Sequence, residues 1–408
     1  MKLGKIFIQI ASYRDNQLLP TIKSCIENSY WPDNLVFCIA WQHSPEDSWD
    51  NLDLYKNDYR FKIIDIDYKQ SQGVCWARNK IQQYYDDEEY TLQLDSHHRF
   101  VPNWDFELIS MLKSLQNKGH AKPLLTTYLP SFNPTNDPQE RCGEIWKLNF
   151  DKFTPQGIVL ILPATIDDAI LLDFPIKSRF YSAHFCFTLG KFCLEVQHDP
   201  NLYFHGEEIS IAARAYTWGY DLFTPHKPIA WHEYTRLHRK KHWDDDSTWS
   251  NKDKISHLRI QKLFGIDGLS NDIDFGKYGF GPHRTLKDYE NYTGICFKNR
   301  IVDQHTLDHK PPPPNPKINS TFKYCINVHK NNFSFDDYQF WAVIFEDDQG
   351  NSLHRQDLLS HDIKRLESDA NGFYNIWRTF SYDKKPYKYI VWPFSAAHGW
   401  CAKIENTL

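Results

Sequence analysis

The chain has 408 residues and a formal net charge of −5, so we expect one large domain with a smaller one, and no surface built for nucleic acid or anionic lipid. Hydrophobic residues make up 41% and charged residues 24%, as in a globular protein, while the 16% of Phe, Trp and Tyr fits either sugar-stacking surfaces or an aromatic-rich core. The nine cysteines are scattered and form no CxxC pair, which argues against a disulfide framework or a structural zinc site and favours a reducing cytoplasm.

Strand-like and helix-like segments alternate in the first part of the chain. Residues 5–11 are β-branched and aromatic and pass directly into polar residues, which indicates a first strand rather than a signal peptide. The same patterning predicts strands at 34–41, 60–67 and 90–94 and helices at 16–30, 73–85 and 104–115. This alternation predicts an α/β fold with a parallel sheet of the nucleotide-binding kind. No stretch reaches the roughly 18 apolar residues of a membrane span, so any work at a membrane would be peripheral.

A run of prolines marks the clearest boundary in the second part. Before it, ordered patterning continues on both sides of a Pro- and Asn-punctuated stretch, in the segments 124–128, 179–195 and 207–234. Lys310–Pro316 cannot continue a helix or pair in a sheet, so we expect an extended linker at 310–320 after a domain of residues 1–309. Residues 321–408 alternate strand-like runs with polar turns, and helical periodicity occurs only near 355–368. They predict a β-rich accessory domain, a sandwich.

Polar side chains gather where three of the expected strands end, and in a parallel sheet such carboxyl ends form the ligand-binding edge. They are Ser12–Asp15, Trp41–Gln42 and Asp95–His97. In extended backbone, residues i and i+2 point to the same side, so Asp95 and His97 can converge on one ion. A carboxylate and an imidazole suit Mn²⁺, with Mg²⁺ as second choice, and such an ion can bridge the phosphates of a nucleotide diphosphate. Taken alone, an Asp-x-His pattern is more often a surface turn.

Five segments in a fixed order give a more specific signal. They are ASYRD (11–15), GVCWARN (73–79), QLDSHHRFVPNWD (93–105), FHGEEISIAARAYTWGYDLFTP (204–225) and WHEYTR (231–236). Together they resemble the bacterial and protist GlcNAc-transferase family that includes the cytoplasmic hydroxyproline GlcNAc-transferase, and more distantly the polypeptide GalNAc-transferases. The resemblance covers roughly residues 5–240.

The resemblance implies a GT-A-type nucleotide-diphospho-sugar transferase with a Rossmann-like mixed sheet. The catalytic domain of residues 1–309 would then have a nucleotide-sugar half, about 1–120, and an acceptor half, about 121–309. The implied reaction moves a sugar from a UDP-sugar to a hydroxyl group on a protein or glycan, with a divalent metal and with retention of configuration; GlcNAc as that sugar rests on the resemblance alone. A carbohydrate-binding protein on an inactive transferase fold and a hydrolase of nucleotide sugars stay open as alternatives.

The resemblance also assigns metal ligands and nucleotide contacts. Asp95, His97 and His232 would bind the metal, although an aromatic-flanked His232 also fits a core residue, and His98 and His226 are lesser candidates. The residues expected to hold the nucleotide sugar are Ser12, Tyr13, Arg14, Gly73, Arg78, Asp95 and Ser96. Among them, Tyr13 would stack on uracil, and a surface salt bridge is the alternative role of Arg78. The neighbouring Asp15 is expected to cap the following helix.

The acceptor side is expected around Glu207 and Glu208, which open a helix after Gly206. Glu207 would orient the acceptor hydroxyl and Glu208 would support it, although the helix dipole favours carboxylates at this place without any function. A double displacement would instead need a carboxylate beneath the anomeric carbon, for which Asp167, Asp168 and Asp173 stay open. A cluster of basic residues follows His232 and is called the basic cluster below; its members are Arg236, His238, Arg239, Lys240, Lys241 and His242. The basic cluster could close as a lid over the diphosphate or form a solvated helix.

Overall fold

The computed structural model describes residues 4–235, 239–270, 272–313, 320–382 and 385–408, and the chain divides into two compact units. The first unit ends at Tyr289 and leaves out Gly265–Leu269, which join Glu290–Leu408 in the second unit. The division therefore falls before the proline run, since Ile301 belongs to the core of the second unit and Asp303 pairs with His354. Of the linker expected at 310–320, residues 314–319 lie outside the described residues.

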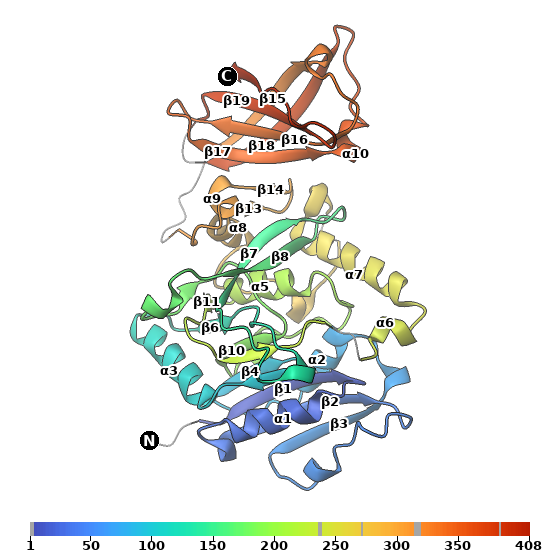
Figure 1. Ribbon diagram of the computed structural model, residues 1–408, viewed down its shortest axis with the longest axis vertical. Coiled ribbons are helices and arrows are strands. Elements are labelled where there is room, and N and C mark those ends of the chain that lie inside the picture. Colours follow the sequence, from blue (N-terminus) through green and yellow to red (C-terminus); the bar gives the residue numbers. More distant parts are fainter. Residues whose placement is uncertain (1–3, 236–238, 271, 314–319, 383–384) are drawn as a thin grey trace. The chain divides into compact units, whose positions relative to one another are not determined.

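The first unit is built on one mixed eight-stranded sheet in the order β3-β2-β1-β4-β10-β6-β11-β9 (Figure 1). The four strands from β3 to β4 are parallel, as the sequence predicts, whereas β10 runs antiparallel to both of its neighbours. The strands are β1 Ile6–Tyr13, β2 Leu35–His43, β3 Phe61–Asp67, β4 Tyr90–Leu94, β6 Pro123–Thr126, β9 Ile176–Lys177, β10 Phe185–Leu189 and β11 Asp221–Thr224. This mixed sheet confirms the expected α/β fold.

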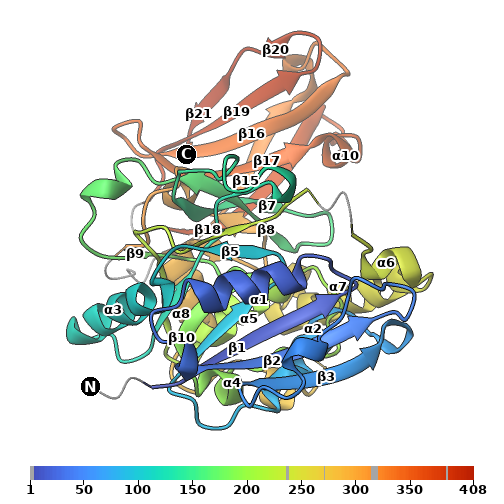
Figure 2. The ribbon, with the colours of Figure 1, turned by 60° about the horizontal axis from the view of Figure 1, so that its bottom comes forward.

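Helices cover both faces of this sheet, because alternate residues of each strand point to opposite faces. Ile6, Ile8 and Ile10 of β1 share a core with α1 (Leu18–Glu27) and α3 (Trp104–Asn117). Phe7 faces the other way, into a core with α2 (Val74–Gln82) and α4 (Phe192–Glu195). These two helices and α1 are labelled in Figure 2. The apolar patterning of the strands therefore places their carboxyl ends, and the polar residues that follow, at one edge between two helical layers.

Smaller elements complete the first unit around that edge. Two short strands form an antiparallel pair, β5 (His98–Phe100) with β12 (Ala230–His232), and β7 (Trp146–Phe153) pairs with β8 (Val159–Thr165). The remaining helices of the first unit are α5 Glu207–Thr217, α6 His242–Asp245 and α7 Trp249–Phe264, and α8 Leu286–Thr293 spans the boundary between the two units. No helix within the described ranges is both long and apolar enough to cross a membrane.

The second unit is β-rich, with a two-stranded and a five-stranded sheet that share one apolar core. Helical structure was expected near 355–368, but residues 352–359 form strand β17 and only Ser360–Ile363 are helical, because pairing with β16 satisfies the backbone there. The elements are β13 Ile295–Cys296, β14 Ile301–Val302, α9 Gln304–Leu307, β15 Ser320–His329, β16 Tyr338–Glu346, β17 Ser352–Leu359, α10 Ser360–Ile363, β18 Phe373–Tyr382, β19 Lys388–Ser395, β20 Gly399–Trp400 and β21 Ile404–Thr407.

Candidate active site

Segments that are distant in the sequence meet just beyond the carboxyl end of β4. The chain leaves β4 through a bend at Asp95–His97 and enters β5, which pairs with β12 so that His98 lies opposite His232. This pairing carries His232 next to the bend. Asp95 and His97 converge, as their i, i+2 spacing predicts, but across a bend and not along an extended strand.

The side chains of Asp95, His97 and His232 form a group that can hold a metal ion, with one ligand atom of each within 4.8 Å of the others. The Asp95 Oδ2 atom lies 3.7 Å from His97 Nε2 and 3.5 Å from His232 Nε2. Both ring nitrogens of His232 are buried and have no hydrogen-bond partner among the described residues. Buried ring nitrogens usually have one, so this set of donors fits a cation.

The protonation states of these groups also fit a cation. Burial lowers the pKa of His232 well below its ordinary range, which keeps the imidazole neutral. Burial alone would raise the pKa of Asp95, but the neighbouring His232 and the charge of Arg78 outweigh it and hold this pKa well below the usual range. Metal ligands need a neutral imidazole and an ionised carboxylate.

A buried carboxylate holds His97 in place. Asp15 Oδ2 lies 2.7 Å from His97 Nδ1 and accepts hydrogen bonds from Ser96 Oγ at 2.7 Å and from Arg239 Nη1 at 3.0 Å. The other oxygen of Asp15 accepts from the backbone N–H of Gln17, but Gln17 is itself the N-cap residue of α1 and no side chain among the described residues caps this helix, so the expected capping role of Asp15 is wrong. With Nδ1 engaged, the Nε2 atom of His97 faces Asp95, which is the usual arrangement behind a metal-bound histidine.

Arg78 joins the metal-ligand group to the start of α5. Its Nη2 atom lies 2.7 Å from Asp95 Oδ1 and its Nη1 atom lies 2.9 Å from Glu207 Oε2, and the side chain is buried. The alternative of a surface salt bridge is therefore wrong. Since a buried guanidinium needs compensating charges, Arg78 and the two carboxylates depend on one another.

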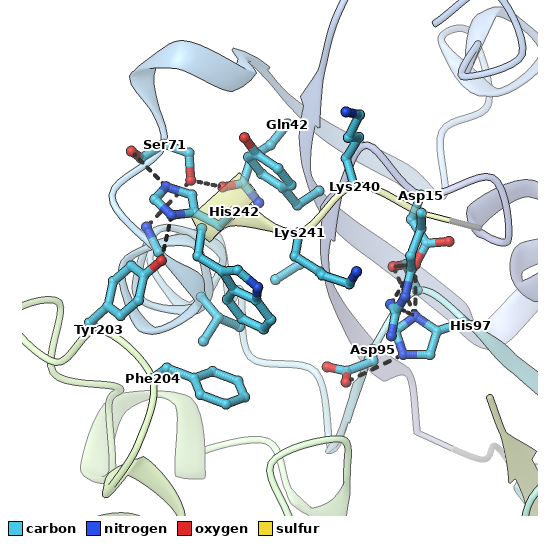
Figure 3. A pocket seen from close by; sticks show the side chains of 17 residues that line it. Asp15, Gln42, Ser71, Asp95, His97, Tyr203, Phe204, Lys240, Lys241 and His242 are labelled. Atoms are coloured by element: carbon cyan, nitrogen blue, oxygen red, sulfur yellow. Dashed lines mark hydrogen bonds and ion pairs between the residues drawn. The ribbon is translucent and has the colours of Figure 1, made fainter. Parts of the chain in front are cut away.

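Two cavities adjoin the metal-ligand group, and the first of them has a volume of about 140 Å³ (Figure 3). Asp15, Asp95 and His97 lie together on one side of it, while Tyr203, Ser71 and His242 lie on the other. Its lining residues are Ala11, Tyr13, Asp15, Gln42, Ser71, Gly73, Val74, Asp95, Ser96, His97, Tyr203, Phe204, Arg239, Lys240, Lys241, His242 and Trp243. The lining combines aromatic rings with several cationic groups.

Only part of the expected nucleotide contacts line this cavity. Tyr13, Gly73, Asp95 and Ser96 do, and Gly73 has φ +112°, with a Cβ there placed 2.9 Å from the Tyr203 ring. Ser12 and Arg14 do not line it.

The structure gives the physical reason why Ser12, Arg14 and Arg78 do not line the first cavity. Ser12 is completely buried. Arg14 lies 2.6 Å from Asp47 and 3.1 Å from Asp245, so its guanidinium is held in ion pairs. Arg78 lines the second cavity instead of the first.

The basic cluster forms part of the wall of the first cavity. Of its members, Arg236 and His238 lie outside the described residues, and Arg239, Lys240, Lys241 and His242 line the cavity. Residues 239–241 are not helical, so the alternative of a solvated basic helix does not hold for them. His242 is fixed by Tyr203 Oη, 2.8 Å from its Nδ1, and by the carbonyl of Ser71, 3.1 Å from its Nε2.

The second cavity, of about 300 Å³, meets the first at Asp95 and Phe204. Glu207 and Glu208 both line it, but they have different partners. Glu207 accepts from Arg78 and from the Cys75 thiol at 2.8 Å. Glu208 accepts from Tyr128 Oη at 2.7 Å and from the Ala183 N–H at 3.0 Å, and burial raises its pKa to about 7.

Sequence reasoning assigned no role to several groups that line the second cavity. His184 stacks on His232 with ring centres 4.1 Å apart, and Tyr128 and Tyr234 line the same cavity. His184 and Tyr128 lie outside the five motifs, so only the folded chain brings them there, whereas Tyr234 belongs to WHEYTR (231–236). Neither His98 nor His226 belongs to the metal-ligand group in the part of the chain that the structure describes. The three carboxylates left open for double displacement line neither cavity, and they are Asp167, Asp168 and Asp173.

Comparisons with known proteins identify the family and the fold of the chain. The model of the family described as Glycosyltransferase (GlcNAc) matches residues 5–60 and 50–299. A solved structure of GalNAc-T7 with UDP, GalNAc and Mn²⁺ is similar over 100% of this chain and 72% of that chain, at 14% identity and a TM-score of 0.53, which shows a shared GT-A-type fold. S. aureus TarS 1–349 in complex with UDP-GlcNAc is similar over 66% of this chain and 75% of that chain, at 13% identity and a TM-score of 0.38. A search of curated proteins found no match.

Proposed function

The chain belongs to the GlcNAc glycosyltransferase family, and we propose that it transfers a sugar from a UDP-sugar to a hydroxyl group with retention of configuration. The preferred sugar in this proposal is GlcNAc. The observation that carries the proposal is the convergence of Asp95, His97 and His232 where two cavities of different chemistry meet. A donor in the first cavity and an acceptor in the second would place the reacting carbon between them.

The first cavity suits a nucleoside diphosphate. Tyr13 and Trp243 offer aromatic surface for uracil, and Arg239 and Lys241 offer positive charge for the phosphates. The similar GalNAc-T7 structure contains UDP and Mn²⁺, which supports the same ligands here. Among the expected nucleotide contacts, Tyr13, Gly73 and Ser96 therefore belong to the donor site, and Arg14 acts by holding Asp47 and Asp245.

A divalent cation fits the group of Asp95, His97 and His232. Two imidazoles with one carboxylate suit Mn²⁺ better than Mg²⁺, which prefers oxygen ligands. When bound, such an ion neutralises the charge that develops on the leaving diphosphate. Asp15 keeps Nε2 of His97 turned inward and Arg78 keeps Asp95 in place, so the ligands need little rearrangement.

The second cavity suits the donor sugar and the acceptor. Glu208, Tyr128 and Tyr234 offer hydrogen-bonding groups to hydroxyls, while Glu207 is held by Arg78 and the Cys75 thiol. Glu208 thus becomes the stronger candidate to orient an acceptor hydroxyl, and Glu207 the supporting group. Retention would follow if the acceptor attacks from the face that the diphosphate leaves, with the departing phosphate taking the hydroxyl proton.

The test is release of UDP from a panel of UDP-sugars, with Mn²⁺ or with chelator, for the wild type and for Asp95→Asn. We expect metal-dependent release from UDP-GlcNAc, and a loss of about 10³-fold in the variant, because the ion contributes several kcal/mol. His361→Gln, an exposed residue of the second unit, is the control.

Two outcomes would contradict the proposal. Release that acceptor hydroxyls never stimulate would favour a hydrolase of nucleotide sugars. If no UDP-sugar is turned over and calorimetry detects no metal-dependent binding of UDP, the protein is a binding module on a transferase fold.

A further inference from the structure

Another group of metal-ligating side chains lies on the same unit and includes none of Asp95, His97 and His232. Asp253 and His257 are four residues apart on α7, so they lie on one face of the helix, and His205 faces them from the loop that precedes α5. One ligand atom of each lies within 4.8 Å of the other two. None of the three has a part in the proposed reaction.

One of the distances in this group has the length that a tetrahedral metal site requires. His257 Nε2 lies 3.5 Å from Asp253 Oδ2. Ligands about 2.0–2.1 Å from a tetrahedral Zn²⁺ are roughly 3.3 Å apart, so this pair needs almost no movement. The rings of His205 and His257 are parallel to within 3°, and their centres are 6.1 Å apart.

The donor atoms are available to an ion. The Nε2 atom of His257 is buried and makes no hydrogen bond to the described residues, although buried polar atoms usually do. His205 is exposed, which gives a path from solvent. An ion pair between His257 and Asp253 alone would not account for the position of His205.

We propose that His205, Asp253 and His257 bind a second divalent cation, with Zn²⁺ preferred over Mn²⁺. Two imidazoles and one carboxylate are a common ligand set of zinc, and they leave one position for water or for a ligand. His205 also lines the second cavity, so the fourth position lies near its rim.

The cation would link the loop before α5, through His205, to α7, through Asp253 and His257. This loop already packs closely on α7, since Tyr203 N–H donates to Ser256 Oγ at 3.0 Å and a Cβ at Gly206 would lie 2.7 Å from the Ile260 side chain. Glu207 follows Gly206 directly. A bound cation would therefore stiffen the segment that presents both carboxylates to the second cavity.

The test measures Zn²⁺ and Co²⁺ binding to the chelator-treated full chain, without any sugar or nucleotide. We expect two equivalents of Zn²⁺ on the wild type and one on Asp95→Asn/His97→Gln. Co²⁺ in the remaining site should show the strong visible absorption of tetrahedral coordination. Adding His205→Ala to the double variant should weaken this binding at least tenfold, whereas adding His361→Ala, the matched control, should leave it unchanged.

A thermal measurement gives a second readout. Zn²⁺ should raise the Tm of the double variant by a few degrees, because a ligand that binds only the folded state stabilises it, and His205→Ala or His257→Gln should abolish this rise. His205 is exposed, so its variant should fold even if His257→Gln does not.

The proposal is overturned if the double variant binds no Zn²⁺ at micromolar concentration, or if His205→Ala leaves the remaining equivalent in place. UDP release with Mn²⁺ is a separate measurement. Failure of this site would therefore leave the proposed transferase activity standing, and the reverse also holds.

Discussion

The two cavities share Asp95 and Phe204 but differ in charge. The first is lined by Arg239, Lys240 and Lys241, whereas the second is lined by Glu207 and Glu208. Cations on one side and carboxylates on the other separate a place for phosphates from a place for hydroxyls. The distribution of charge between the two cavities therefore comes from two segments, 239–243 and 204–209. The sheet that supports both segments does not set it.

One buried side chain connects the two sides. Arg78 contacts Asp95, which belongs to both cavities, and Glu207, which belongs to the second. Changes at Arg78 should therefore affect both cavities, whereas changes at Lys241 or Glu208 should affect one.

The largest expected effect is that of Arg78→Met. It leaves two carboxylates without their cation, so we expect the free energy of unfolding to fall by about 3–5 kcal/mol. Urea unfolding measures this, with Arg14→Met, which breaks a different ion-pair group, as a comparison. A loss below about 1 kcal/mol would mean that Asp95 and Glu207 do not depend on Arg78 for their compensating charge.

Glu208→Gln tests the second cavity, which is lined by carboxylates. Burial raises the pKa of Glu208 to about 7 from 4.5, so the folded protein holds a proton that the unfolded chain releases between these values. Stability should then fall as pH rises from about 4.5 to 7, by up to roughly 3 kcal/mol, and the variant should lose this dependence.

Unfolding by urea at pH 5 and pH 7.5, followed by Trp fluorescence, measures the effect of Glu208→Gln. The exposed Glu46→Gln in the same unit is the control. An unchanged pH dependence in the Glu208 variant would show that another group carries the proton.

Asp15→Asn tests the donor side. The change weakens the hold on His97 Nδ1, so we expect Mn²⁺ affinity to fall about 10–100-fold, with a smaller change in folding stability. Titration of Mn²⁺ followed by its electron spin resonance signal measures the affinity. Asp47→Asn, which disturbs Arg14 but not His97, is the matched control, and equal losses in both variants would remove Asp15 from the metal site.

The smallest expected effect is that of Lys241→Ala. We expect UDP binding to weaken by about tenfold or less, with a weaker dependence on salt, because a half-exposed cation is partly screened. Calorimetry measures this beside Lys227→Ala, which pairs with Glu107 away from both cavities. If Lys241→Ala changes acceptor KM and not UDP affinity, the assignment of the two cavities is reversed.

The sequence predicted much of the frame and part of the site. The strands β1 to β4 and the helices between them follow from apolar periodicity, and the Asp-x-His spacing indicated two of the metal-ligand residues. It was only partly right near 355–368, where Ser360–Ile363 are helical but the residues before them form β17, because pairing with β16 overrides local periodicity. It also grouped Ser12 and Arg14 with Tyr13, because adjacent residues share a motif even when their side chains point to different places.

By itself, the sequence determined the alternating strands and helices and the polar residues at the ends of the strands. It also indicated the turn at Gly73, where the backbone needs a glycine. These features depend on residues that are close together in the chain. Only the tertiary structure decided that β5 pairs with β12 to bring His232 to Asp95, that Arg78 lies between two carboxylates, and that His205 faces α7. The physical reason is that backbone periodicity is local, whereas contacts between distant segments depend on how buried side chains pack and which charges they bury together.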